Sequence, residues 1–104
     1  MKTIIRLTSM AFIGAIAAFP VHANEKLTTD NGCMACHKID TKAVGPSFKE
    51  IAAKYKGDAG AEAAMIDKVK KGGSGAWGAV PMPPNSPRVS DADIETMVKW
   101  ILAM

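Results

Sequence analysis

Histidine and cysteine are both scarce in this chain, which has two residues of each among its 104. A structural zinc site needs four ligands, usually drawn from two separated cysteine pairs, and this sequence has one pair. The sequence also lacks a run of about 20 apolar residues, the length that a membrane-spanning helix requires. Basic residues form no stripe with aromatic residues between them, so we expect no nucleic-acid partner. The length of 104 residues suits one small domain, and no internal repeat or domain boundary is visible in the sequence.

The beginning of the chain follows the layout of a secretory signal peptide. A basic start leads into an uncharged, largely apolar run over residues 7–19, which ends at Pro20, and small residues then precede a cleavage point after Ala23. We therefore predict a signal peptide over residues 1–23, export to the periplasm, and a mature domain over residues 24–104. A retained membrane anchor is the alternative, but the apolar run is shorter than a span needs, so no stable membrane insertion is expected after cleavage.

Hydrophobic spacing in the mature chain predicts an all-α domain of four short helices. The helices are expected over residues 26–31, residues 48–55, residues 60–71 and the stretch that follows Ser90. The second has apolar residues spaced i, i+3, i+4 and i+7, and the last has a continuous apolar face after a serine that suits an N-cap. No stretch alternates convincingly as a strand. The segment from Gly72 to Ser90, with four glycines and four prolines, is expected to be a long loop.

The decisive motif is Cys33-Met34-Ala35-Cys36-His37, a C-x-x-C-H pattern that is typical of c-type haem attachment. Two thiols three positions apart reach the two vinyl groups of one haem and form thioethers with them. The adjacent histidine then lies under the ring, where it coordinates iron. We therefore predict one haem c per chain, bound covalently through Cys33 and Cys36 and ligated by His37.

Three other interpretations of the cysteine pair are weaker. A thioredoxin-like redox pair expects a βαβ context, which the predicted helices do not provide. A zinc site would need a second pair of ligands. A structural disulfide, which export would permit, explains the cysteines but leaves the adjacent histidine without a role.

The sixth iron ligand cannot be a second histidine, because His22 lies in the predicted signal peptide and the mature chain would retain only His37. The sixth position is then empty or filled by another side chain, and methionine is the usual soft partner. Met82 stands between prolines in residues 80–85, and these stiffen the loop that would close on iron. Met65 and Met97 fit apolar helix faces, so core packing is the better interpretation for both. Met82 is therefore the predicted ligand, and a loop residue that fills the core is the alternative.

Together these motifs resemble the small bacterial class I cytochromes c, specifically the five-fifty-one/five-fifty-two group. The similarity covers essentially all of residues 24–104. It rests on Gly32 to His37, Val44-Gly45-Pro46, Gly75-Ala76-Trp77-Gly78, Pro81-Met82-Pro83-Pro84-Asn85 and Lys99-Trp100-Ile101-Leu102. The attachment motif alone defines only c-type haem, whereas the ordered set is far more specific.

The resemblance implies a compact class I cytochrome c fold around one covalent haem, and it implies roles for single residues. His37 and Met82 would be the axial ligands, and the carbonyl of Pro46 would accept the other ring N–H of His37. Trp77 would hydrogen-bond a haem propionate. Asn85 would donate to the sulfur or to the backbone near Met82.

The resemblance also implies a monomeric, non-enzymatic carrier of single electrons. Its partners would be redox proteins, with a membrane complex or dehydrogenase as donor and a terminal oxidase or reductase as acceptor. Two axial ligands leave no open coordination site, which suits outer-sphere electron transfer. A small peroxidase or gas-binding haem protein is the enzymatic alternative, and it requires Met82 to be absent from the iron.

Overall fold

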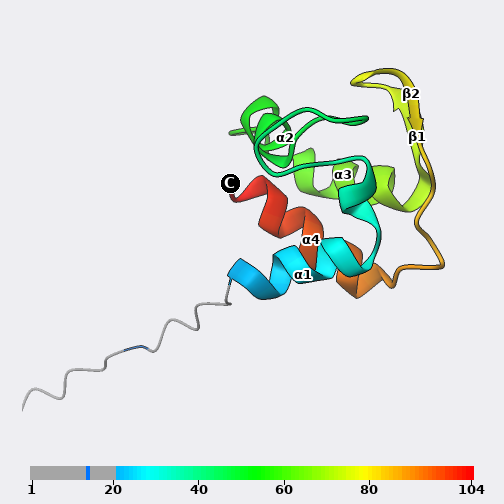
Figure 1. Ribbon diagram of the computed structural model, residues 1–104. Coiled ribbons are helices and arrows are strands. Elements are labelled where there is room, and N and C mark those ends of the chain that lie inside the picture. The colour runs from blue at the N-terminus through cyan, green and yellow to red at the C-terminus, as the bar shows by residue number, and fades with distance from the viewer. Residues whose placement is uncertain (1–13, 15–20) are drawn as a thin grey trace, which may run out of the picture.

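The computed structural model describes residue 14 and residues 21–104, so most of the predicted signal peptide lies outside the described residues. The elements are α1 (Val21–Asp30), a 3-10 turn η1 (Cys33–Ala35), α2 (Phe48–Lys54), α3 (Ala61–Lys71), β1 (Gly73–Gly75), β2 (Gly78–Met82) and α4 (Asp91–Leu102). The four α-helices confirm the expected architecture (Figure 1). Across the described part of the chain, none of these helices has both the length and the hydrophobicity that a membrane crossing demands.

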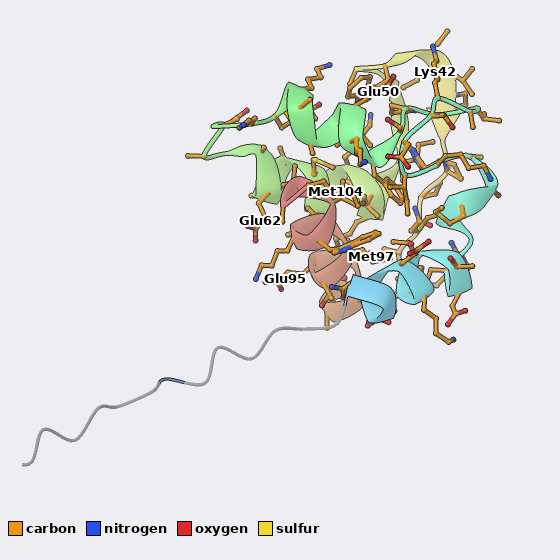
Figure 2. All side chains as sticks on the ribbon, turned by 60° about the vertical axis from the view of Figure 1, so that its left-hand side comes forward. Lys42, Glu50, Glu62, Glu95, Met97 and Met104 are labelled. Atoms are coloured by element: carbon orange, nitrogen blue, oxygen red, sulfur yellow. The ribbon has the colours of Figure 1, made fainter. Side chains whose placement is uncertain are left out.

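Helix α4 is the centre of the packing, because α1, α2 and α3 each pack against it (Figure 1). One buried cluster joins α4 to α1 and α3, and it consists of Val89, Ile94, Met97 and Val98 with Leu27, Met65, Ile66 and Val69 packed against them. A second cluster joins Ile101 of α4 to Phe48 and Ile51 of α2. Figure 2 shows Met97 inside the domain, whereas Glu62 and Glu95 lie together at its outer edge. Burial of each large apolar side chain stabilises the fold by about 1.5–3 kcal/mol.

The predicted start of helix α2 is reinforced by a capping box, which was not among the features predicted from the sequence. The Ser47 hydroxyl accepts from the amide of Glu50 at 3.1 Å, and the Glu50 carboxylate accepts from the amide of Ser47 at 3.0 Å. This reciprocal pair satisfies two amides that the first turn leaves without helical partners. Ser90 caps α4 through its hydroxyl, which accepts from the Asp93 amide at 3.2 Å. Both helices therefore begin where their serines place them.

Helix α1 begins at Val21 rather than at residue 26, where the spacing had predicted its start. Leu27 packs against the α4 cluster, and Thr28 is completely buried with its hydroxyl donating to the Glu25 carbonyl at 2.7 Å. Polar residues surround these two positions in the sequence, so apolar residues do not recur there at helical spacing. Contact with α4, rather than a local pattern, supports the longer helix.

The expected loop after α3 contains a hairpin in which β1 and β2 pair antiparallel (Figure 1). Gly73 pairs with Met82 and Gly75 with Gly78, with an irregularity between the two pairs. Both strands are short, and their sequences, Gly-Ser-Gly and Gly-Ala-Val-Pro-Met, contain no alternation of apolar and polar residues. The prediction that this segment has no strand was therefore wrong.

Candidate functional site

One cavity of about 310 Å³ brings together most of the residues that the sequence singles out. Cys33, Cys36 and His37 of the attachment motif line it, and so does Met82. Pro46 and Trp77 line it as well, together with Thr28, Phe48, Ile51, Tyr55, Met65, Val69, Val80, Met97, Val98 and Ile101. The volume lies in the range of pockets that hold a ligand. A largely apolar lining with two thiols, an imidazole and a thioether fits a haem.

The attachment motif occupies the turn that follows α1. Gly32 has a φ of +79°, a conformation that favours glycine at the end of a helix. The amide of His37 donates to the carbonyl of Cys33 at 3.0 Å and closes the turn. Cys33 and Cys36 are both partly buried, and no disulfide joins them. Burial raises the pKa of the Cys33 thiol, and the nearby positive charge of Arg88 partly offsets that effect.

His37 is oriented by the backbone and by a neighbouring ring. Its Nδ1 lies 2.7 Å from the carbonyl oxygen of Pro46. Because a carbonyl only accepts, Nδ1 carries the proton and donates it, which leaves the lone pair of Nε2 available to a metal. Phe48 stacks on the imidazole with ring centroids 5.5 Å apart, and a Cβ at Gly45 would come within 2.8 Å of the ring. The hydrogen bond expected between His37 and Pro46 is therefore present, and the imidazole has little room to turn.

Met82 ends strand β2, and the loop that follows it is fastened to the end of α3. The backbone amides of Asn85 and Ser86 donate to the carbonyls of Val69 and Lys70 at 3.1 and 3.2 Å. Those carbonyls belong to the last turn of α3, where no further helical amide follows to bind them. The same two hydrogen bonds thus complete the helix and set the position of the Met82 loop.

Gly72 leaves no space for a side chain where this loop passes. Its φ is +71°, and an added Cβ would collide with the Met82 carbonyl oxygen and lie 2.8 Å from the carbonyl carbon of Pro83. We expect Gly72→Ala to lower the free energy of unfolding of the holoprotein by more than the roughly 1–3 kcal/mol that strained backbone alone costs. Gly57→Ala is the matched control, because Gly57 has a similar φ of +79° but faces open space. Denaturant titration that gives equal losses for both variants would contradict this account of the loop.

Trp77 lies in the turn of the hairpin, and Lys54 of α2 holds it there. The Lys54 Nζ lies 4.3 Å from the centroid of the Trp77 ring and donates to the carbonyl of Ala76 at 3.0 Å. A cation over an exposed indole contributes about 0.5–1 kcal/mol. The contact fastens the hairpin turn to α2 beside the cavity that Trp77 lines. The contact of Trp77 with a haem propionate stays a prediction.

Asn85 is buried next to the Met82 loop but is not among the cavity-lining residues. Its side-chain Nδ2 donates to the carbonyl of Pro83 at 3.2 Å and to that of Val69 at 3.1 Å. Of the two contacts expected for it, the structure therefore has the one to backbone adjacent to Met82. Asn85 therefore links the Met82 loop to α3 through its side chain as well as its main chain.

Two side chains that help to position residues of the site, Lys54 and Arg88, were not predicted from the sequence. Lys54 acts on Trp77, and Arg88 donates to the side chain of Asn85 at 2.6 Å and to the carbonyl of Asn31 at 3.2 Å. Neither residue belongs to a motif. Because Lys54–Trp77 and Arg88–Asn31 are far apart in sequence, no spacing rule marks them.

A helical domain with a C-x-x-C-H turn on an apolar cavity defines a c-type haem protein. The family model described as Cytochrome c matches residues 22–104. Cytochrome c-551 of Pseudomonas aeruginosa is 52% identical over 79 residues, which cover 76% of this chain and 74% of that protein. Cytochrome c-551 of Azotobacter vinelandii is 53% identical over 78 residues, which cover 75% of this chain and 93% of that protein. The crystal structure of wild-type Nitrosomonas europaea cytochrome c552 matches with a TM-score of 0.71 and 49% identity, over 75% of this chain and 95% of that one.

The chain therefore belongs to the cytochrome c family. Its cofactor is haem c, bound covalently through Cys33 and Cys36, and the family carries electrons. When bound, the haem iron supplies a reversible one-electron couple between Fe(III) and Fe(II).

Proposed function

We propose that this protein is a periplasmic carrier of single electrons whose iron is held between His37 and Met82. The observation that carries the proposal is the shared cavity: His37, whose Nδ1 is engaged with the Pro46 carbonyl, and Met82, whose loop is fastened to α3, both line it. A membrane complex or dehydrogenase would supply the electron, and a terminal oxidase or reductase would accept it. The protein would act as a monomer and would perform no chemistry of its own on a substrate.

Occupation of both axial positions suits electron transfer for a physical reason. His37 and Met82 would each belong to a constrained segment, so their positions would change little between the two oxidation states. A small change in ligand geometry means a small reorganisation on electron transfer. Methionine ligation and an apolar cavity both raise the reduction potential.

Export is the basis for the periplasmic location. The layout of residues 1–23 is that of a signal peptide cleaved after Ala23. Helix α1 begins at Val21, so cleavage at that point would remove its first three residues and leave Leu27 and Thr28 in the core. Mass spectrometry of the exported protein would identify the first residue directly.

An absorption spectrum of the purified holoprotein tests the ligation. Coordination by Met82 would give the oxidised protein a sulfur-to-iron charge-transfer band, and covalent haem would survive acid extraction. A resting protein that lacks this band and binds added ligands at once has an open site. That result would favour the peroxidase or gas-binding alternative.

A small apolar rim would serve as the contact with redox partners. We define it as Met34 and Ala35 beside the attachment site, with Pro83 and Pro84 after the proposed ligand. Ala35, Pro83 and Pro84 are exposed and Met34 is partly buried, while Lys38 borders the rim and donates to the Met34 carbonyl at 3.1 Å. A small contact area allows the quick release that a mobile carrier needs.

Charge would contribute little to that docking. Removal of the signal peptide leaves eleven basic and ten acidic residues. With a haem and its two ionised propionates the net charge comes to about zero when oxidised and about −1 when reduced, so long-range steering is weak.

We therefore expect electron transfer to partners to depend only weakly on salt. Met34→Lys and Pro83→Glu should slow it several-fold, because each places a charge that must lose water in the apolar rim, while the reduction potential stays nearly unchanged. Ala63→Lys, at an exposed position of α3, is the control for an added charge elsewhere. Stopped-flow rates over a range of ionic strength provide the measurement. Steep salt dependence in the parent, with unaltered rates in both rim variants, would rule out this surface.

A further inference from the structure

Arg88 connects the end of α1 to the loop that carries Met82. Its Nη2 donates to the side-chain oxygen of Asn85 at 2.6 Å, and its Nη1 donates to the carbonyl of Asn31 at 3.2 Å. We propose that Arg88 is a positioning residue for Met82, acting through Asn85. This inference rests on the proposed ligation of iron by His37 and Met82.

The first step of the argument is the orientation of the Asn85 amide. A guanidinium has only donors, so it must face the oxygen of the amide and cannot face its NH2 group. With the oxygen held by Arg88, the NH2 group faces the carbonyls of Val69 and Pro83, to which it donates at 3.1 and 3.2 Å. Arg88 and the two carbonyls thus favour the same rotation of the amide, the one in which Asn85 ties the Met82 loop to helix α3.

The second step concerns burial. Asn85 is only 7% exposed, and without the guanidinium its side-chain oxygen would lose a charge-assisted hydrogen bond in a poorly solvated position. The amide would then keep only its two hydrogen bonds to the carbonyls of Pro83 and Val69, and the Asn85 side chain would be held less firmly. Because Pro83 directly follows Met82, the loosened segment is the one that presents the thioether.

The third step concerns the second contact of the Arg88 guanidinium, the one with the Asn31 carbonyl. Asn31 directly follows α1 and lies two residues before Cys33, the first attachment cysteine. Arg88 contacts the Asn31 carbonyl and the Asn85 side chain at the same time. It therefore joins the segment that leads to Cys33 to the segment that follows Met82, and both segments would hold the haem. A planar fork with fixed donors suits this double contact, whereas the single ammonium of a lysine does not reproduce it.

The test is the rate at which added imidazole displaces Met82 in the oxidised holoprotein, followed by loss of the sulfur-to-iron band. We expect Arg88→Met to raise this rate about five- to tenfold, which corresponds to about 1–1.4 kcal/mol. Arg88→Lys keeps the charge but not the fork, so its rate should lie nearer to that of Arg88→Met than to the parent's. Lys26→Met, which removes an exposed charge from α1, is the control and should leave the rate unchanged.

A double-mutant cycle with Asn85→Ala tests whether Arg88 acts through Asn85. In that background Arg88→Met should change the rate less than twofold. An equal rise in both backgrounds, an unchanged rate in Arg88→Met, or the same rise in Lys26→Met would overturn the positioning role while leaving the ligation intact. A parent protein without the sulfur-to-iron band would overturn the proposed ligation, and this inference with it.

Discussion

Met82→Ala is expected to open the sixth coordination position and to lower the reduction potential. If Met82 is the sixth ligand, as proposed, loss of its thioether removes a soft ligand that favours the reduced state, and water or an added ligand then reaches the iron. Axial ligands set haem potentials over a range of about 0.8 V, and we expect a shift on the order of 0.1–0.2 V within it. Redox titration and the absorption spectrum of the oxidised protein measure the two effects. The sulfur-to-iron charge-transfer band should disappear.

Two other methionines provide the controls for that experiment. Met65 and Met97 also line the cavity, although Met97 is 3% exposed and both pack with the buried clusters. Replacement of either by leucine keeps the volume and should cost less than about 1.5 kcal/mol of stability, with the charge-transfer band retained. If the band survives in Met82→Ala and disappears in Met65→Leu or Met97→Leu, the ligand has been assigned to the wrong methionine.

Most of the helical architecture could be predicted from the sequence because each element carries its own local signal. Helices α3 and α4 have terminating glycines or a capping serine, and α2 and α4 have apolar faces of the helical period. The attachment motif is equally local, since five adjacent residues contain two thiols and the imidazole. Such features depend only on residues that are close in the sequence, so they can be recognised without a structure.

The remainder depends on contacts between distant segments. The strands of the hairpin are short and rich in glycine, so their pairing left no hydrophobic alternation in the sequence. Helix α1 is stabilised by the burial of Leu27 and Thr28 against the rest of the fold, although polar residues surround them. Arg88 could not be recognised as a partner of Asn31, because only the folded chain brings them together.

Replacement of either attachment cysteine is expected to have the largest effect on the yield of holoprotein. Cys33→Ala and Cys36→Ala each remove one of the two thioethers, so the haem would be held by a single covalent link or lost. A domain of this size buries a modest core, and the cavity beside α4 is lined by the same side chains that form that core. Failure to attach haem should therefore also lower stability, leaving little folded holoprotein in the exported fraction.

The spectrum of the denatured, reduced haem in alkaline pyridine distinguishes one thioether from two, because each link removes one vinyl group from conjugation with the ring. Acid extraction separates covalent from non-covalent haem in the same samples. Met34→Leu is the matched control, since it changes the residue between the cysteines but neither thiol. We expect the two-link spectrum in the parent and in Met34→Leu, and a one-link spectrum or no haem in both alanine variants. A normal two-link spectrum from either alanine variant would contradict the attachment of the haem through both cysteines.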